Sequence, residues 1–518
     1  GVAEAASCCR GLGPGPSRRR VTRLRVPRGH RGGHPPGLQQ WQPHLDRSRP
    51  VLPGPEPSPE PAAARCNRGQ PGRAPAGATA RGADARRTSS GGRLIGALDG
   101  VPVLLKDNIA TRDALNTTVG SFALLGSVVR RDAGVVTRLR RAVAVVLGKA
   151  NPSEWCNIRR VDDGWSARGG QSLNPYALSS TPCGSSAGPG VAAAANMAAV
   201  TLGTETDGSI LCPSSFNSVV GIKPTVGLTS RDGVVPISPR QDTVGPMCRT
   251  VSDAVQLLDA IVGYDAFDAA ATRAASKYIP SGGYTQFLKK DGLRGKRIGV
   301  LNGFFQGKGE TQLRVYNQHL TTMREHGAVV IENLDVATNL TALLVEIGSN
   351  EGIAIRAEFK LNLNAYLAEL RSSPVRSLAE IIAFNNAHPV QERLEDFGQD
   401  NLIAAEKTQG IGSVERAAIQ RLEELSANGL EKLMKEKQLD AIVTPDTSAS
   451  SLLAITGLPA VVVPAGYGEA GVPFGICFGG LQGYEPRLIE MAYAFEQATK
   501  VRRPPMYGNL ARTSFFLR

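Results

Sequence analysis

Apolar runs of strand length alternate with helical patterns of apolar residues from Leu94 onward. The run from Val101 to Leu105 predicts a short buried strand, and Gly134 to Arg141 places its apolar residues at helical spacing. Val143 to Leu147 then predicts another strand. Such alternation is typical of a layered α/β fold, in which helices cover a sheet.

The pattern continues through the rest of the chain. Val191 to Val200 is rich in alanine and uncharged, which predicts a helix buried on all sides. Thr250 is placed to cap a helix that runs to about Val262. The polar, glycine-rich stretch from Asn157 to Ser186 is expected to be mostly loop. Further strands are expected at 218–222, 296–301, 328–331, 440–445 and 458–463, and further helices at 343–370, 413–437 and 487–499.

The first 93 residues differ from the rest in composition. They contain 17 arginines, no lysine and 5 acidic residues, and so hold nearly all of the formal charge of +13. They also hold 14 of the 34 prolines and show little hydrophobic periodicity, so they cannot bury enough apolar surface to fold alone. We therefore divide the chain into a disordered segment, 1–93, and a nearly neutral folded body, 94–518. The absence of lysine before Lys106 favours a mistranslated segment, and a genuine basic arm that binds an anionic surface is the alternative.

Cysteine usage and hydropathy limit the class of protein further. The eight cysteines lack the paired short spacing of a zinc site, and we expect them to be buried free thiols. No run of about 18 apolar residues occurs in the sequence, so no membrane span is expected. Nothing near Gly1 resembles a secretion signal. The compartment stays open, with the cytoplasm slightly favoured.

Three segments carry candidate catalytic side chains. Ser209 follows Gly208 in a turn whose backbone N–H groups can converge on a developing oxyanion. Lys106 directly follows the apolar strand, where loss of solvation would lower its pKa and make it a candidate base. Ser186 lies in the middle of Gly184–Gly188, which fits the Gly-x-Ser-x-Gly nucleophile elbow.

The elbow makes an α/β-hydrolase with a Ser-His-Asp triad an alternative. That site needs a strand before the serine, whereas 171–181 is polar and rich in turn residues. It also needs a histidine, and those downstream are His319, His326 and His388. We expect the first two to be solvated on a polar helix. A serine activated by a neutral lysine is therefore favoured, because a serine hydroxyl is a weak nucleophile without a neighbouring base.

Several motifs occur in the order and spacing of the amidase signature family. They are Gly100–Asp107, Gly184–Ser186, Gly203–Ile210 and Gly221–Thr225. From about Gly96 to Thr499 the chain resembles this family, and it looks most like the fungal and bacterial amidases. The resemblance implies a three-layer α/β/α fold, in which helices cover both faces of a large mixed sheet.

The resemblance also implies a catalytic site and a reaction. Ser209 would be the nucleophile, Ser185 a bridging serine held by a cis peptide, and Lys106 the base of a Ser-Ser-Lys triad. The amidase would hydrolyse the C–N bond of a small carboxamide through an acyl-enzyme, with no metal or organic cofactor and no nucleic-acid or membrane partner. The oxyanion hole would be formed by backbone N–H groups of Thr206, Asp207, Gly208 and Ser209.

Some features leave the function within the family open. Leu211 stands where many relatives have arginine, and Ala187 and Pro189 replace small residues after the serine pair. An amidase-type subunit of a tRNA-dependent amidotransferase is an alternative, although the nearly neutral body gives no support for a tRNA surface. The substrate and the oligomeric state are not determined, and we expect variable pocket walls within 343–402.

Overall fold

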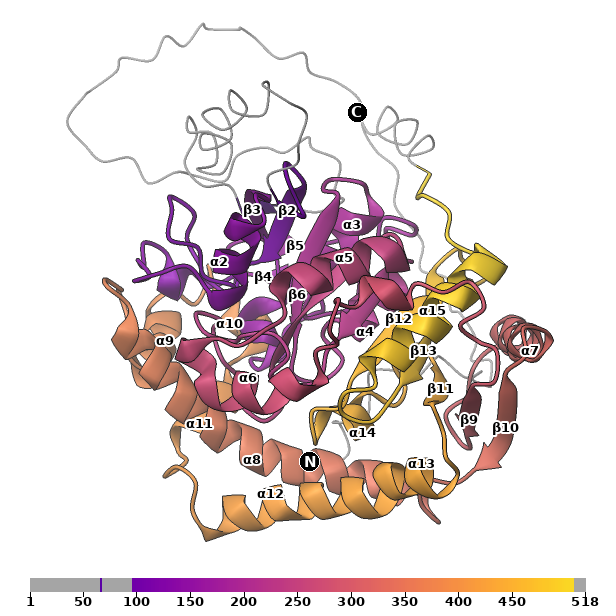
Figure 1. Ribbon diagram of the computed structural model, residues 1–518. Coiled ribbons are helices and arrows are strands. Elements are labelled where there is room, and N and C mark those ends of the chain that lie inside the picture. Colours follow the sequence, from indigo (N-terminus) through magenta and orange to yellow (C-terminus); the bar gives the residue numbers. More distant parts are fainter. Residues whose placement is uncertain (1–65, 68–95, 507–518) are drawn as a thin grey trace, which may run out of the picture. The chain divides into compact units, whose positions relative to one another are not determined.

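A mixed sheet of eleven strands organises the residues that the computed structural model describes, which are 66–67 and 96–506 (Figure 1). The strand order is β1-β3-β2-β6-β8-β7-β12-β13-β11-β9-β10. The strands are β1 Cys66–Asn67, β2 Pro102–Lys106, β3 Val145–Ala150, β6 Val200–Glu205, β7 Val220–Lys223, β8 Thr243–Cys248, β9 Arg297–Leu301, β10 Val329–Leu334, β11 Ala441–Pro445, β12 Ala460–Tyr467 and β13 Pro473–Gly479. A separate small hairpin pairs β4 Trp165–Ser166 with β5 Gly170–Gln171.

Parallel and antiparallel pairs alternate in blocks across the sheet. β2 runs parallel to β3 and β6, and β9 runs parallel to β10 and β11. The remaining pairs, including β6 with β8 and β12 with β13, are antiparallel. Buried residues of β2 point alternately to the two faces, so that Val103 and Leu105 join one hydrophobic cluster and Leu104 another.

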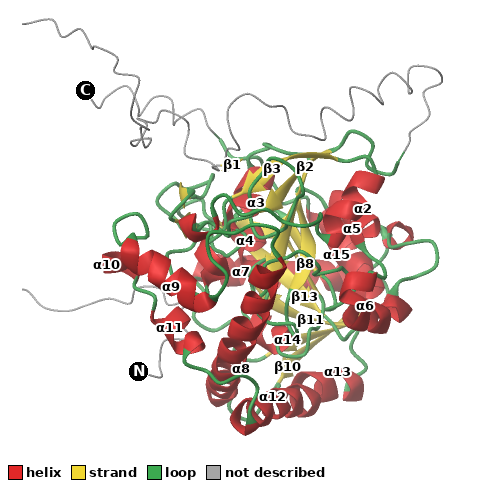
Figure 2. Ribbon diagram, turned by 90° about the vertical axis from the view of Figure 1, so that its left-hand side faces the viewer, coloured by secondary structure: helices red, strands yellow, loops and turns green. Residues whose placement is uncertain are grey.

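Helices cover both faces of the sheet, as Figure 2 shows with the strands between them. On one face the main hydrophobic cluster joins the strands to α2 Gly134–Arg141, α5 Val251–Ile261, α7 Glu310–Glu325 and α15 Glu485–Thr499. On the other face lie α3 Ala187–Ala194, α4 Leu211–Phe216, α8 Leu340–Glu369, α12 Ser413–Ser426 and α14 Ser450–Ala454. The remaining helices are α6 Ala269–Ala275, α9 Leu378–Ala387, α10 Leu394–Phe397, α11 Asp400–Glu406 and α13 Lys432–Glu436.

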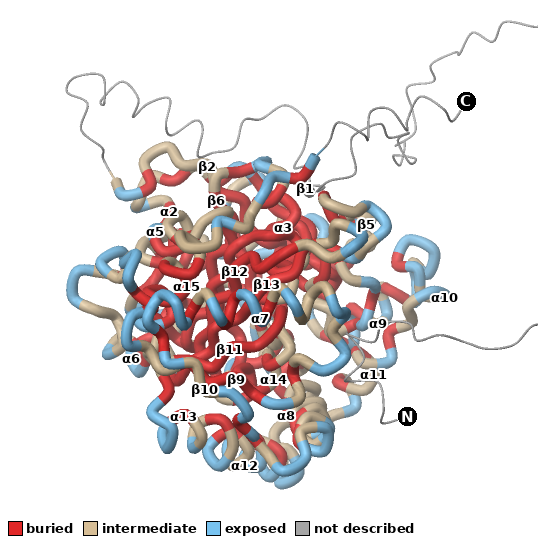
Figure 3. Tube along the Cα trace, turned by 90° about the vertical axis from the view of Figure 1, so that its right-hand side faces the viewer, coloured by how far each residue is buried: buried red, intermediate tan, exposed pale blue. Residues whose placement is uncertain are grey.

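Burial follows this layering. The central strands are buried along nearly their whole length, whereas α12 and α13 expose one side to solvent (Figure 3). Helix α3 is buried at every position, in keeping with its uncharged, alanine-rich sequence. The predicted three-layer α/β/α architecture with a large mixed sheet is confirmed.

Most predicted elements are present, with shifted ends. The helix 134–141 has the predicted bounds, and Lys106 ends β2. The alanine-rich helix lies earlier than predicted, because it spans Ala187–Ala194 and Val200 already starts β6. Pro189 is the third residue of that helix, within the first turn, where its missing N–H is not needed.

Three central strands, β6, β8 and β13, have no counterpart among the predicted elements. β8 contains Gly245 and Pro246, and β13 contains three glycines or prolines at positions that weaken a strand pattern. The ladder between β8 and β7 covers only Met247 and Cys248, so Pro246 removes no hydrogen bond from that ladder, whereas on its other side Pro246 lies opposite Leu202 within the ladder to β6.

The prediction of disorder for 1–93 falls almost wholly outside the described residues. The exception is Cys66–Asn67, which forms β1 and pairs antiparallel with Lys149 and Ala150 at one edge of the sheet. The division at residue 93 therefore stays a prediction. None of the helices within 96–506 is long and apolar enough to cross a membrane.

Candidate active site

The candidate catalytic residues meet at one edge of the sheet, where two neighbouring parallel strands end. Lys106 is the last residue of β2, and Glu205 is the last residue of β6. Because the carboxyl ends of parallel strands lie at the same edge, the turn that follows β6 is brought next to Lys106. Ser209 lies in this turn, and Ser185 lies in the loop before α3.

A continuous chain of hydrogen bonds links an amine to two hydroxyls. Nζ of Lys106 donates to Oγ of Ser185 at 2.7 Å, and Oγ of Ser185 lies 2.9 Å from Oγ of Ser209. Lys106 is fully buried and Ser185 is 1% exposed, whereas Ser209 is 9% exposed at the end of the chain of contacts. The arrangement allows a proton to move from the accessible hydroxyl toward the buried amine.

The loop that carries Ser185 is fixed on both sides. The peptide bond between Gly184 and Ser185 is cis, as the resemblance implied. The carbonyl of Ser185 accepts from the N–H of Ser153 at 3.0 Å, and the N–H of Ser186 donates to the carbonyl of Ser209 at 3.1 Å. The two serine-bearing segments are therefore joined through their backbones as well as through their hydroxyls.

A disulfide also joins these two segments, contrary to our expectation of free thiols. Cys183 and Cys212 are bonded, with their Cα atoms 5.8 Å apart. Cys183 precedes Ser185 by two residues, and Cys212 follows Ser209 by three. Because the two serines touch, the cysteines that flank them also lie close together, and cysteine spacing alone does not contain this signal. The cysteines at 156, 248 and 477 are free, as expected.

The turn before Ser209 has the geometry of a donor cluster. Among the described residues, the backbone N–H groups of Asp207, Gly208 and Ser209 have no hydrogen-bond acceptor. Gly208 has φ +75°, a conformation that side chains with a Cβ adopt rarely. Oε2 of Glu205 accepts from the N–H of Ile210 at 2.6 Å and of Leu211 at 2.9 Å, which fixes the far side of the turn. Glu205 was not among the predicted site residues.

Electrostatics favour a neutral amine at Lys106. Burial lowers the pKa of Lys106, and nearby Cys156, Glu205 and Asp242 oppose this shift. Nζ also donates to the carbonyl of Thr204 at 3.2 Å, which orients the amine without adding a charge. A neutral amine at this position would act as a base toward the hydroxyl of Ser185.

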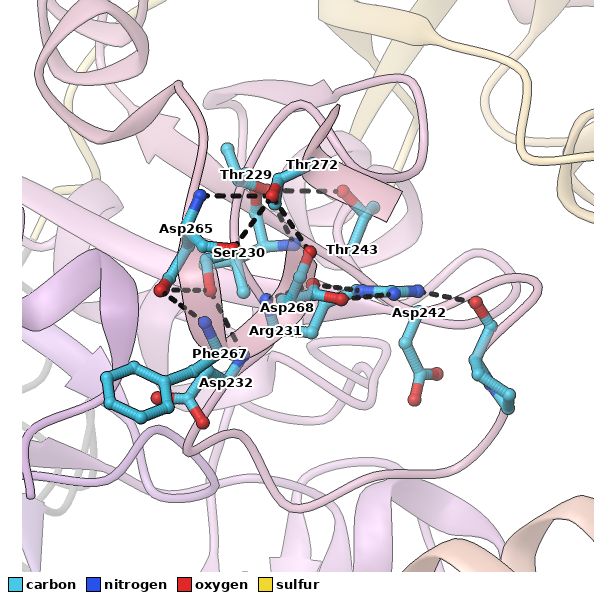
Figure 4. Close-up of polar contacts among 12 residues, drawn as sticks. Thr229, Ser230, Arg231, Asp232, Asp242, Thr243, Asp265, Phe267, Asp268 and Thr272 are labelled. Atoms are coloured by element: carbon cyan, nitrogen blue, oxygen red, sulfur yellow. Dashed lines mark hydrogen bonds and ion pairs between the residues drawn. The ribbon is translucent and has the colours of Figure 1, made fainter. Parts of the chain in front are cut away.

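A polar network next to the site supports the turn that contains Thr206 and Ser209. Figure 4 shows Arg231 bound to Asp268, with Nε and Nη2 each 2.8 Å from a carboxylate oxygen. Arg231 also donates to the carbonyl of Pro239, which closes the loop that leads to Asp242. Oδ1 of Asp242 accepts from Oγ1 of Thr206 at 2.6 Å. The loop thus anchors the first residue of the candidate oxyanion turn.

Ser209 opens onto a cavity of about 330 Å³. Its walls include Glu351 and Ile355 of α8, which lie within the predicted wall region 343–402, but most of the lining comes from other segments. These segments are 156–158, 163, 183–185, 206–209, 212, 237, 447 and 450–451. No local pattern in the sequence indicates this assembly, since the segments meet only in the folded chain.

The Ser-His-Asp alternative has no support in the described residues. Oγ of Ser186 donates to the carbonyl of Thr204 at 3.0 Å, and no strand directly precedes it. His319 on α7 is buried against Phe495 of α15, so our expectation of a solvated side chain was wrong. His388 caps α9, where Nδ1 contacts the carbonyl of Phe384 at 2.8 Å. Neither His319 nor His388 lines the cavity.

The fold and the buried contacts of Lys106, Ser185 and Ser209 define an α/β protein with a serine-lysine site. Comparisons with known proteins identify its family. The model of the amidase family matches residues 74–453. A protein of Arabidopsis thaliana that carries the name amidase is 58% identical over 412 residues, which are 79% of this chain and 78% of the relative. A glutamyl-tRNA(Gln) amidotransferase subunit of Synechococcus elongatus is 30% identical over 80% of this chain and 88% of its own.

Solved structures agree with this assignment. The native peptide amidase of Stenotrophomonas maltophilia superposes with a TM-score of 0.77 at 44% identity, over 84% of this chain and 90% of that one. The chain belongs to the amidase family, whose members are hydrolases of carbon–nitrogen bonds in amides. The family match begins at residue 74, about twenty residues before the folded body that we predicted.

Proposed function

We propose that this protein hydrolyses the C–N bond of a carboxamide with Ser209 as nucleophile, Ser185 as proton relay and Lys106 as base. The observation that carries the proposal is the buried chain of contacts from Nζ of Lys106 through Oγ of Ser185 to Oγ of Ser209, at 2.7 and 2.9 Å. The same two distances suit the reverse donor order, in which Ser209 donates to Ser185 and Ser185 donates to the amine.

The first half of the reaction forms an acyl-enzyme. Oγ of Ser209 attacks the carbonyl carbon while its proton passes to Ser185 and the proton of Ser185 passes to Nζ of Lys106. The negative charge on the carbonyl oxygen is stabilised by the N–H groups of residues 206–209. When the C–N bond breaks, the ammonium of Lys106 returns its proton through Ser185 to the leaving amine. An ester of Ser209 remains.

The second half releases the acid. Water attacks the ester carbonyl and gives its proton through Ser185 to Lys106, and the same relay then protonates Oγ of Ser209 as it leaves. Every proton of the relay is thus restored at the end of the cycle. The lowered pKa of Lys106 supports this scheme, because the base must be unprotonated before each attack.

A fluorophosphonate probe tests the nucleophile directly. We expect the probe to label the wild-type protein and not Ser209→Ala, while Ser450→Ala, another serine of the cavity wall, keeps its labelling. Lys106→Ala and Ser185→Ala should lose hydrolysis of a peptide amide, the substrate class that the name of the peptide amidase suggests testing first. Labelling that survives Ser209→Ala would refute the assignment of the nucleophile.

Membership of a tRNA-dependent amidotransferase is the second candidate function, favoured by the 30% identity to the Synechococcus protein across 80% of the chain. Such a protein would hydrolyse glutamine and pass ammonia to a partner. Hydrolysis of glutamine that exceeds that of all other amides, and that increases with added partner proteins, would favour this candidate over a free-standing amidase.

A further inference from the structure

Acidic side chains, and no basic ones, line the described part of the Ser209 cavity. They are Asp163, Asp207 and Glu351, and the described lining contains no lysine, arginine or histidine. Asp163 lies on the Ser185 side, where a β-carbon added to Gly184 would come 2.9 Å from its Oδ1. Asp207 is two residues before Ser209 in the oxyanion turn. Carboxylates therefore stand on both sides of the reacting hydroxyl.

These three carboxylates have no cationic partner among the described residues, because none of them takes part in an ion pair. Oδ2 of Asp207 accepts from Oγ of Ser451 at 2.6 Å, but its Oδ1 is buried without a hydrogen-bond partner. Oε1 of Glu351 accepts from Nε2 of Gln241 at 2.6 Å. Partial desolvation of unpaired carboxylates costs free energy, so binding of an external cation would be favourable here.

The groups that face Glu351 determine the pH at which its carboxyl becomes charged. Burial and the neighbouring Asp207 raise the pKa of Glu351 to about 8, and Glu358 acts in the same direction. Arg240 opposes the shift, but its guanidinium is already bound to Glu358 at 2.6 and 3.0 Å. Glu351 is therefore largely protonated near pH 7 and becomes a carboxylate as the pH rises through about 8. A bound cation would replace repulsion between carboxylates by attraction.

The shape of the lining suits an organic cation. Ile158, Ile237 and Ile355 supply apolar surface beside the carboxylates. Such a mixture fits a side chain with an aliphatic stem and a charged head, which buries the stem and pairs the head. No group of three His, Cys, Asp or Glu residues in the described chain lies close enough to hold a metal ion.

Resting on the proposed function, we propose that this cavity selects amides that carry an ammonium or guanidinium group on an aliphatic stem and discriminates against amides that carry a carboxylate. Glu351 and Asp163 are the residues that determine this specificity. They act on the substrate's charged group and not on the amide bond, so their loss should change the ranking of substrates and spare the reaction itself.

Three α-amides of similar size test the inference on the full chain: N-acetyl-lysinamide, its uncharged counterpart N-acetyl-norleucinamide, and the α-amide of N-acetyl-glutamate. Ammonia release at pH 9, where Glu351 is ionised and the lysine side chain keeps its proton, gives kcat/KM for each. We expect the lysine amide to exceed the norleucine amide roughly tenfold, as for one charge-assisted contact, and the glutamate amide to be the slowest. Glu351→Gln and Asp163→Asn should each lower the ratio of lysine to norleucine amide while retaining hydrolysis of the norleucine amide.

Glu325→Gln is the matched control, because it removes one carboxylate from an exposed position on α7, away from the cavity. Its substrate ratio should equal that of the wild type. Hydrolysis of the norleucine amide that requires Ser209, without preference for the lysine amide, overturns the inference and leaves the proposed function intact. A ratio of lysine to norleucine amide that neither Glu351→Gln nor Asp163→Asn changes also overturns the inference and leaves the proposed function intact. A protein that hydrolyses none of the three amides overturns the proposed function and this inference together.

Discussion

Removal of the disulfide between Cys183 and Cys212 offers a quantitative test of how the two serine-bearing segments are held. The bond closes a loop over a sequence separation of 29 residues, and both ends of this loop line the cavity. The double variant Cys183→Ala/Cys212→Ala opens the loop. It leaves the backbone contact from Ser186 to Ser209 and the hydroxyl chain in place.

The expected magnitude follows from the length of the loop. A disulfide across 29 residues reduces the entropy of the unfolded chain by an amount that corresponds to about 3–4 kcal/mol at 25 °C. For an ordered body of roughly 400 residues this is a decrease in Tm of about 4 °C. At temperatures well below the transition we expect most of the activity to remain, because the direct contacts between the two segments persist.

Thermal unfolding followed by circular dichroism measures the effect, at one scan rate and with and without a phosphine reductant. The reductant should lower the Tm of the wild type to that of the double variant and should not change the double variant. Equal Tm values for the two proteins under oxidising conditions would refute the reasoning, since the cross-link would then contribute nothing to stability. A further decrease when the double variant is treated with reductant would show that a different thiol pair is involved.

Lys106, Glu205, His388 and Glu351 each give one further prediction. In the proposed mechanism Lys106 must be unprotonated, so kcat/KM for a neutral amide should fall as the pH decreases through the pKa of Lys106, which burial places below the ordinary lysine value; a flat profile would contradict this role. Glu205→Gln should weaken the backbone contacts to the Ser209 turn and lower stability by about 1–3 kcal/mol, measured by urea denaturation. His388→Ala should leave kcat unchanged, whereas loss of activity in this variant would restore the Ser-His-Asp alternative. The preference for a guanidinium-bearing amide over a neutral one should increase as the pH rises through about 8, because Glu351 then loses its proton, and Glu351→Gln should abolish this dependence.

Elements whose ends depend on local contacts could be predicted from the sequence. Helix α5 starts where the side chain of Thr250 accepts from the N–H of Asp253 at 3.1 Å, a contact that needs no distant partner. Strand β13 depends on the opposite kind of contact. A β-carbon at its Gly475 would lie 2.8 Å from Cγ2 of Val462 on the adjacent strand β12, so the glycine is required by packing between strands. The local sequence around Gly475 does not indicate that Val462 will be its neighbour.

The same distinction holds for the site. Lys106 and Ser209 could be proposed from their local sequence, since an apolar strand and a glycine turn are local features. Ser185 came from the family resemblance, because the residues alone left Ser186 as a competing nucleophile. The disulfide and the carboxylates of the cavity were missed, as they become neighbours only when loops from distant segments are brought together at the edge of the sheet.

The neutral state of Lys106 depends on how its acidic neighbours are themselves compensated. Burial raises the pKa of the Cys156 thiol, so this neighbour is uncharged near neutral pH and adds little to the stability of an ammonium. Burial raises the pKa of the Glu205 carboxyl, and Lys223 and two backbone N–H groups oppose that shift, whereas Asp242 is held by Thr206 and by its own loop. Each negative charge near the amine thus has other partners, and the desolvation of Lys106 prevails. Loss of the two N–H contacts to Glu205 should therefore raise the pKa of this carboxyl, remove a negative charge that favours an ammonium at Lys106, and so lower the pKa of Lys106, which a shift of the pH–rate profile to lower pH would show.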